Sequence, residues 1–280
     1  MNFLKRLVDT FCGQPRHGNR DEVSAAAQFK GAGAAAGATD SAVSGRQKLG
    51  MPQGFPSKDS FLKRIIAVGV PVSEIVDVGV REGTYELVSN FPQLRHQLFE
   101  PAKHCFNDIA QNYRSVDYVL HARALGSANA LRYLVSWSLG RDGLPTHSGI
   151  QAELPQVDGL NVVAAEEFRI ERFDSLNIQV ADDFLLKVDV DGLDTEVLKG
   201  FGECVRRASV VIVESTTAFV AERSALLQAA GFVLVDIVDL AYYGPSLYQL
   251  DLCFVRGDLV TEKLRPDISR FDGALWNQIA

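Results

Sequence analysis

Three acidic side chains, Asp77, Glu100 and Asp189, stand where buried strands are expected to end. Asp77 leads into a glycine turn, Gly79-x-x-x-Gly83. Gly79 permits a sharp backbone turn, and Gly83 permits the start of the next helix to approach a ligand closely. Because a carboxylate at this corner repels a pyrophosphate, the turn favours a cationic or hydroxyl-bearing ligand.

Glu100 stands 23 positions after Asp77. In nucleotide-binding α/β folds, an acidic residue about 20 positions beyond the first turn holds the ribose hydroxyls. The two carboxylate oxygens can accept both hydroxyl protons. Arg81 and Thr84, in and just after the turn, join the candidate cofactor-binding residues. The spacing therefore predicts a nucleoside site, although the G-x-G-x-x-G fingerprint of dinucleotide enzymes is absent.

Asp189 lies near the end of an apolar run, and further acidic residues follow it at Asp191, Asp194 and Glu196. Acidic residues in the first turn of a helix complement its dipole, which explains Asp194 and Glu196. That explanation does not cover Asp189, which lies in the strand. We expect Asp189 to face the reaction centre.

Short apolar runs alternate with segments of helical periodicity, which predicts an α/β fold with a mostly parallel sheet. No helix-length segment separates the last two runs, so they are expected to pair antiparallel. The predicted strands are 75–79, 97–100, 116–124, 184–190, 209–214, 232–238 and 250–255. The predicted helices are 61–68, 84–91, 101–113, one around 196–198, and 221–230.

Two segments depart from this alternation. Residues 1–50 are rich in Ala, Gly, Ser and Thr and are expected to form a flexible arm, which leaves one domain over 51–280. Residues 126–173 contain alternating apolar runs around a turn-rich stretch, which predicts a β-hairpin or small β-cap inserted before the fourth strand. Ligands of open α/β sheets bind outside the carboxyl ends of the strands, so this cap would cover the pocket.

Composition excludes several classes of protein. The 28 basic residues against 35 acidic ones give a net charge of −7, which disfavours nucleic-acid binding. No apolar run reaches the roughly 18–20 residues that span a bilayer. The four cysteines are far apart and form no disulfide framework or metal-ligand pattern, and the N-terminus is not a persuasive secretory signal. A cytoplasmic protein without a metal is expected.

The order of these motifs resembles FkbM-like methyltransferases over about residues 60–255. The matching segments are Asp77-x-Gly79-x-x-x-Gly83, Phe99-Glu100-Pro101, Leu186–Gly192 and Glu196–Gly200. This resemblance implies a seven-strand Rossmann-like methyltransferase fold that uses S-adenosylmethionine, often to O-methylate sugars or natural products. It also implies that Asp77, Gly79 and Gly83 line the methionine and adenosine side, that Glu100 holds the ribose, and that Asp189 faces the methyl acceptor.

The chain departs from the family pattern at two positions. Arg81 stands where Asn is common, which brings a cation close to the expected sulfonium, and Asp191 stands where Glu or Gln is common. Candidate bases for a hydroxyl acceptor are Asp189, then Glu214, then His121, with His147 a weaker choice.

The acceptor is expected to be a small molecule or a glycan. Four aromatic residues, Tyr133, Trp137, Tyr242 and Tyr243, either stack a sugar or pack the core. Two other functions stay open. One is a nicotinamide-dependent oxidoreductase, which the missing glycine and the antiparallel final strands disfavour. The other is a non-catalytic binding module that keeps the fold, for which Arg81 is the best support.

Overall fold

The computed structural model describes residues 56–137, 147–151, 162–190, 192–265 and 269, which all belong to a compact unit spanning Met51–Ala280. The expected arm over 1–50 lies outside the described residues.

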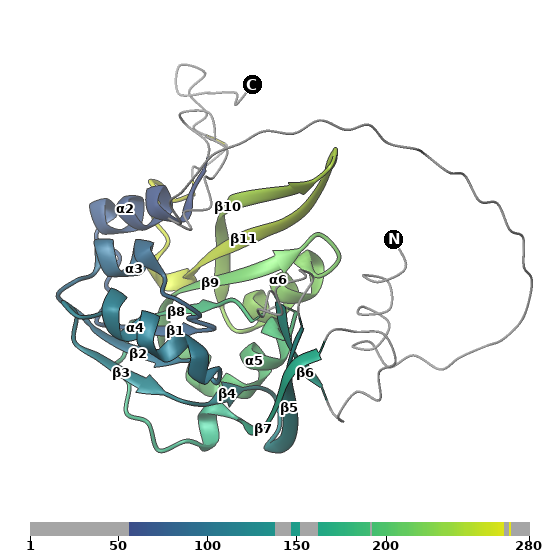
Figure 1. The fold of residues 1–280 in the computed structure, drawn as a ribbon. Helices are drawn as coiled ribbons and strands as arrows, with labels where there is room; N and C mark the ends of the chain where they lie inside the picture. The colour runs from purple at the N-terminus through teal and green to yellow at the C-terminus, as the bar shows by residue number, and fades with distance from the viewer. Residues whose placement is uncertain (1–55, 138–146, 152–161, 191, 266–268, 270–280) are drawn as a thin grey trace, which may run out of the picture. The chain divides into compact units, whose positions relative to one another are not determined.

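A seven-stranded sheet forms the centre of the fold (Figure 1). Its strand order is β10-β11-β9-β8-β1-β2-β3. The bounds are β1 Glu74–Val78, β2 Arg95–Phe99, β3 Tyr118–His121, β8 Phe184–Val188, β9 Ala208–Thr216, β10 Phe232–Tyr243 and β11 Ser246–Arg256. The neighbours from β9 through β8, β1 and β2 to β3 pair in parallel, and β11 runs antiparallel to both β9 and β10. The predicted α/β class, seven strands and antiparallel last strand are confirmed.

Helices cover both faces of this sheet because its central strands are apolar on both sides. The bounds are α2 Lys58–Val68, α3 Tyr85–Asn90, α4 Phe106–Asn112, α5 Asp194–Phe201 and α6 Val220–Ala229. In β8, Leu186 and Val188 pack in one core cluster with residues of α5 and α6, whereas Leu185 packs in a second cluster with α2 and α3. A third cluster joins α4 to β2. The alternation of side chains along each strand therefore divides the molecule into an α2–α4 face and an α5–α6 face.

Helix α2 ends where the sequence predicts, at Val68, but begins at Lys58, before the predicted start at residue 61. The Ser57 hydroxyl accepts a hydrogen bond from the backbone N–H of Ser60, and the backbone N–H of Ser57 donates to the Ser60 hydroxyl, which forms a capping box. Gly69 ends the helix with φ 78°, a left-handed conformation that favours glycine.

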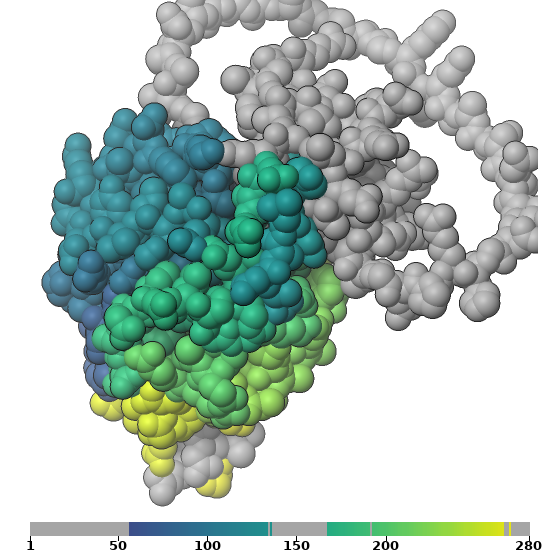
Figure 2. Space-filling view, turned by 90° about the horizontal axis from the view of Figure 1, so that it is seen from below, coloured from purple at the N-terminus to yellow at the C-terminus, as the bar shows by residue number. Residues whose placement is uncertain are grey.

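The insertion before the fourth strand of the main sheet is a second sheet, of order β4-β7-β5-β6. Its strands are β4 Ala124–Leu125, β5 Ala130–Trp137, β6 His147–Gln151 and β7 Val162–Glu171. The expected hairpin or β-cap is therefore a four-stranded sheet that starts two residues before Gly126. Phe173 and Val180, which follow it, pack into the core cluster of the α5–α6 face. In Figure 2, the teal and green part of the chain around the end of β7 and after it lies across the middle of the visible face.

Several predicted elements have different bounds. The strand expected over 116–124 is only Tyr118–His121, and the helix expected over 101–113 is a 3-10 turn at Lys103–Cys105 followed by α4. The last two strands are longer than expected and form a twisted hairpin that reaches Tyr243 and Ser246. The residues around the tip, near Tyr243 and Ser246, are polar or aromatic. The apolar pattern used to predict the strands therefore stops before the strands end.

Asp194 stabilises the turn between β8 and α5. The sequence explains it only by the helix dipole, but in the structure it makes further contacts. Its side chain is fully buried, and its carboxylate accepts hydrogen bonds from the backbone N–H groups of Val190 (3.1 Å) and Gly192 (3.2 Å). Arg223 of α6 donates to the same carboxylate at 2.8 Å. Burial raises the pKa of Asp194 to about 6, and Arg223 and the N–H of Val190 partly offset the rise. Asp194 therefore joins the turn after β8 to α6.

Replacing Asp194 with Asn should destabilise the fold by about 3–5 kcal/mol, because it leaves the buried Arg223 without a counter-charge. The double variant Asp194→Asn/Arg223→Met should lose less than the sum of the two single losses. Urea unfolding of the four proteins measures this coupling.

The matched control is Asp258→Asn, which breaks an exposed ion pair with Arg256 and should change the unfolding midpoint little. Purely additive losses at Asp194 and Arg223 would contradict the ion-pair explanation.

Candidate functional site

The end of β1 meets the end of β8 at Gly79. Gly79 has φ 81°, and a Cβ atom there would lie 1.8 Å from the carbonyl oxygen of Asp189. The N–H of Asp189 donates to the carbonyl of Val78 at 3.0 Å. Only glycine fits this contact, so the turn fixes Asp189 beside the carboxyl end of β1.

Asp77 points into the α2–α4 face and is fully buried. One of its oxygens lies 3.3 Å from the Nζ of Lys187, and the other accepts a hydrogen bond from the Tyr113 hydroxyl at 3.3 Å. The Tyr113 oxygen in turn accepts from the backbone N–H of Thr84 at 3.2 Å. Asp77 thus connects β1 to α4 and to the start of α3.

Lys187 lies between two carboxylates in a strand whose other described side chains are apolar and buried. Its Nζ is 3.3 Å from Asp77, 3.4 Å from Asp189, and donates to the carbonyl of Gly79 at 3.0 Å. Burial acts to lower the pKa of Lys187, but the two carboxylates outweigh it and raise the pKa above its ordinary value. Lys187 therefore stays charged and joins Asp77, Gly79 and Asp189.

Glu100 follows β2 and is buried, with 7% of its surface exposed. One carboxylate oxygen accepts from the N–H of Arg81 and the other from the N–H of Ala102, each at 2.8 Å. Burial raises the pKa of Glu100, and these two hydrogen bonds act against the rise. Each carboxylate oxygen has two lone pairs, so one on each is left for a further donor.

Arg81 contributes to this arrangement through its backbone. Its φ of 52° is in the left-handed region, and its N–H points at Glu100. The side chain itself is exposed. The backbone of Arg81 therefore holds Glu100 in place, and its side chain takes no part in this contact.

Gly83 and Thr84 lead into α3. Gly83 has φ 140°, and a Cβ atom there would lie 3.2 Å from the Tyr113 ring, so this glycine permits close packing against the end of α4. Thr84 is buried, and its N–H contacts the Tyr113 hydroxyl.

Two of the three predicted bases, Asp189 and Glu214, lie close together, and a side-chain hydrogen bond with Glu214 acts to lower the pKa of Asp189. Burial acts to raise the pKa of Asp189, but Lys187, Lys58 and the hydrogen bonds from Glu214 and Lys187 outweigh it, so the pKa lies below its ordinary value. Asp189 is thus ionised at neutral pH. Its side chain remains 35% exposed.

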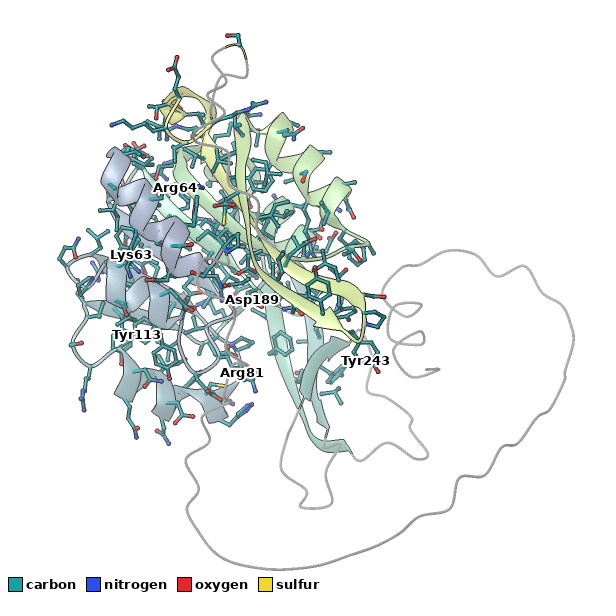
Figure 3. The ribbon with its side chains drawn as sticks, turned by 90° about the horizontal axis from the view of Figure 1, so that it is seen from above. Lys63, Arg64, Arg81, Tyr113, Asp189 and Tyr243 are labelled. Carbon is teal, nitrogen blue, oxygen red and sulfur yellow. The ribbon has the colours of Figure 1, made fainter. Side chains whose placement is uncertain are left out.

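Gln249 of β11 supports this carboxyl pair because its side-chain amide donates to Glu214. A second ion-pair group lies on the same face, where Lys58 of α2 contacts Asp251 at 2.7 Å and Asp239 at 3.7 Å. Burial acts to lower the pKa of Lys58, but Asp251 outweighs it and the pKa is raised. In Figure 3, Asp189 lies between the helices of this face and the β10–β11 hairpin.

His121 is not brought to this cluster. It lies opposite Phe99 in the β2–β3 register, and its ring stacks on Phe99 with centroids 4.6 Å apart. Phe99 belongs to the core of the α5–α6 face, whereas Asp77 and Tyr113 lie on the other face. Burial lowers the pKa of His121, whose Nε2 lies 2.8 Å from the side-chain oxygen of Gln97.

The remaining predicted residues either lie outside the described part of the chain or make no contact with the Asp77–Lys187–Asp189 group among the described residues. Asp191 and the side chains of His147 and Trp137 lie outside the described part of the chain. Tyr133 is half-buried, and its hydroxyl reaches Glu167 at 3.5 Å. The cysteines that the structure describes, Cys105, Cys204 and Cys253, are free, and burial raises the pKa of the Cys105 thiol to about 12.

In the described ranges, no helix is long and apolar enough to cross a membrane, and no three His, Cys, Asp or Glu side chains are grouped to hold a metal.

Sequence reasoning missed Lys187, Lys58 and Tyr113. A usable signal existed for Lys187, because a lysine within an apolar strand is almost never buried unless it is paired. Its two neighbouring acidic candidates, Asp77 and Asp189, were the available partners. No comparable local pattern marks Lys58 or Tyr113, which reach the site from helices.

Comparisons with known proteins give only loose structural similarity. No model of a known family matches the sequence, and no curated protein matches it. A precorrin-6y C5,15-methyltransferase from Geobacter metallireducens is 9% identical, with 75% of this chain and 94% of that chain covered at a TM-score of 0.39. An S-adenosylmethionine-dependent methyltransferase from Clostridium acetobutylicum is 9% identical, with coverages of 71% and 90% and a TM-score of 0.40. A Pyrococcus abyssi tRNA (uracil-54, C5)-methyltransferase in complex with S-adenosyl-L-homocysteine is 11% identical, with coverages of 70% and 37% and a TM-score of 0.37. At these values the similarity carries no assignment of function.

Replacing Gly79 with Ala should destabilise the fold strongly, because the new methyl group cannot be accommodated beside the Asp189 carbonyl. Gly231→Ala is the matched control, since Gly231 has φ 93° and open space around it. The control should lose only the roughly 1–2 kcal/mol of left-handed strain. Thermal unfolding compares the two, and equal losses would contradict the steric role of Gly79.

Proposed function

We propose that this chain is an S-adenosylmethionine-dependent O-methyltransferase of the FkbM-like kind, acting on a hydroxyl-bearing small molecule or glycan. The observation that carries the proposal is the position of Asp189. It is a partly exposed anionic carboxyl group, held against the Gly79 turn at the carboxyl end of the central strand. Ligands of open α/β sheets bind at this edge, next to the strand where the chain order reverses. Strand β1 lies between β8 and β2 at that reversal.

The residues at this edge fit the proposed cofactor. Glu100 is oriented by two backbone N–H groups and keeps a lone pair on each oxygen for the ribose hydroxyls. Asp189 supplies negative charge for a cation, and the exposed Arg81 side chain is compatible with this arrangement. When bound, S-adenosylmethionine supplies an electrophilic methyl group on a positively charged sulfur.

Asp189 is the proposed acceptor of the hydroxyl proton. The acceptor oxygen would bond to the methyl carbon as the carbon–sulfur bond breaks and S-adenosylhomocysteine leaves, and the hydroxyl proton would move to an Asp189 oxygen. A side chain in this role contributes roughly 10²–10⁴-fold to a rate. Glu214 holds Asp189 in place through the shared hydrogen bond, and Lys187 keeps Asp189 ionised. His121 is not proposed in this role because it lies on the other face of the sheet.

A nicotinamide-dependent oxidoreductase has less support, because the glycine fingerprint is missing and Asp77 occupies the end of β1. A non-catalytic binding module also has less support. Arg81, its main argument, orients Glu100 through the backbone, and its side chain is exposed.

Cofactor binding can be tested by thermal unfolding with S-adenosylmethionine, S-adenosylhomocysteine and NAD. A specific ligand at 100 times its Kd stabilises a protein by about 2.7 kcal/mol. Both methyl-cycle ligands should raise the unfolding temperature, and NAD should not. The absence of a shift with either methyl-cycle ligand would refute the proposal.

Glu100→Gln should weaken S-adenosylhomocysteine binding roughly 10- to 150-fold, since hydrogen bonds to a charged group contribute about 1.5–3 kcal/mol. Glu203→Gln, which changes an exposed carboxylate, is the control and should leave the Kd unchanged. Isothermal titration calorimetry measures both. An unchanged Kd for Glu100→Gln in a folded protein would remove Glu100 from the cofactor site.

Lys187→Met should shift the acid limb of kcat/KM to higher pH. With Lys187 present, the pKa of Asp189 is below its ordinary value, so activity is lost only when the pH falls below that value. Without the cation, Asp189 takes up a proton at a higher pH, and the limb should rise by about one unit or more. Lys199→Met, at an exposed pair with Glu196, should leave the profile unchanged.

A pH profile of Lys187→Met that matches the parent, in a variant with normal cofactor binding, would contradict the role of Lys187. Asp189→Asn with full turnover would exclude Asp189 as the proton acceptor.

A further inference from the structure

Exposed aromatic side chains gather on the β10–β11 hairpin. Among the described residues, seven large apolar side chains are exposed, and four of them belong to this hairpin: Ile237, Tyr242, Tyr243 and Tyr248. Tyr243 is the most exposed of the seven, at 73%. Tyr242 and Tyr243 therefore do not pack the core, and rings left in water in this way are typical of binding surfaces.

The hairpin extends beyond the main sheet at the edge where the candidate site lies. The last residue of β9, Thr216, pairs with Gln249, and Thr217 donates a backbone hydrogen bond to Tyr248; the described register of β10 with β11 continues from there to Tyr243 and Ser246. Strand β9 is parallel to β8, so its end lies at the same edge as Asp189. Figure 1 shows the hairpin projecting past β9, and Figure 3 marks Tyr243 near its tip.

Gln249 connects this hairpin to the carboxyl pair, since its side chain donates to Glu214. Ala241 lies opposite Gln249 in the register. The register shift between Ala241 and Tyr242 adds the extra residue to β11, so the alternation along β10 is kept. Tyr243 therefore lies on the same face as Ala241, about 6.6 Å further along the strand.

We propose that this face of the hairpin binds the methyl acceptor, with Tyr243 as the stacking side chain and Gln249 as a positioning residue for Glu214. The inference rests on the proposed function and deepens it. An aromatic ring on the same hairpin face as Gln249, which contacts Glu214, suits a ligand that has an apolar C–H face and hydroxyl groups, such as a sugar ring.

The charges of the site select for an uncharged ligand. Asp189 is anionic, and Lys58 and Lys187, two largely buried cations near it, are already paired with carboxylates. An anionic group would meet repulsion and find no unpaired cation among these residues. The structure thus favours neutral carbohydrates over phosphorylated or acidic ones.

The test is a glycan array probed with the full chain in the presence of S-adenosylhomocysteine, followed by calorimetry on the neutral glycan that binds most tightly. Tyr243→Ala should weaken glycan binding about tenfold or more, and Tyr243→Phe should restore it. Ile66→Ala, an exposed apolar residue of α2, is the control and should have no effect. The Kd for S-adenosylhomocysteine should stay within about twofold in all three variants, which excludes misfolding.

The outcomes separate the two proposals. Binding of S-adenosylhomocysteine without any glycan binding, or glycan binding that Tyr243→Ala leaves unchanged, overturns the hairpin proposal and leaves the proposed function standing. Binding confined to acidic glycans overturns the selection for a neutral ligand. A chain that does not bind S-adenosylhomocysteine overturns the proposed function itself.

Discussion

The ion bridge from Asp77 through Lys187 to Asp189 is the interaction on which the site depends. Two carboxylates at the ends of adjacent parallel strands would repel each other in a buried environment, and removal of one partner from such a group costs several kcal/mol. Lys187 makes their approach possible and also binds the Gly79 carbonyl. The same cation keeps Asp189 ionised, so folding and the proposed proton transfer share one requirement.

Side chains alternate along the strands, so an apolar core and the candidate site lie on opposite faces of the sheet. One face of the sheet holds an apolar core under α5 and α6, together with the stacked rings of Phe99 and His121. The opposite face holds the ion pairs at the strand ends. A histidine on the apolar side and carboxylates on the other cannot act together, even though all of them stand near the ends of their strands.

Long-range contacts bring the hairpin into this arrangement. Lys58 at the start of α2 binds Asp239 of β10 and Asp251 of β11, and Arg64 of the same helix binds Asp236. These pairs fix the base of the hairpin against the first helix. Its tip, with Tyr243, then extends past β9 towards the edge where Asp189 is exposed.

The sequence by itself determined the strand and helix order, the glycine turn after Asp77, the antiparallel last strand and the inserted β structure. Periodicity and turn residues act locally, so they can be seen without a structure. Tertiary structure alone decided that Asp189 meets Glu214, that His121 faces away, and that Asp194 is buried against Arg223. These outcomes depend on strand register and on side chains that meet from distant parts of the chain, and the local pattern of residues does not encode either.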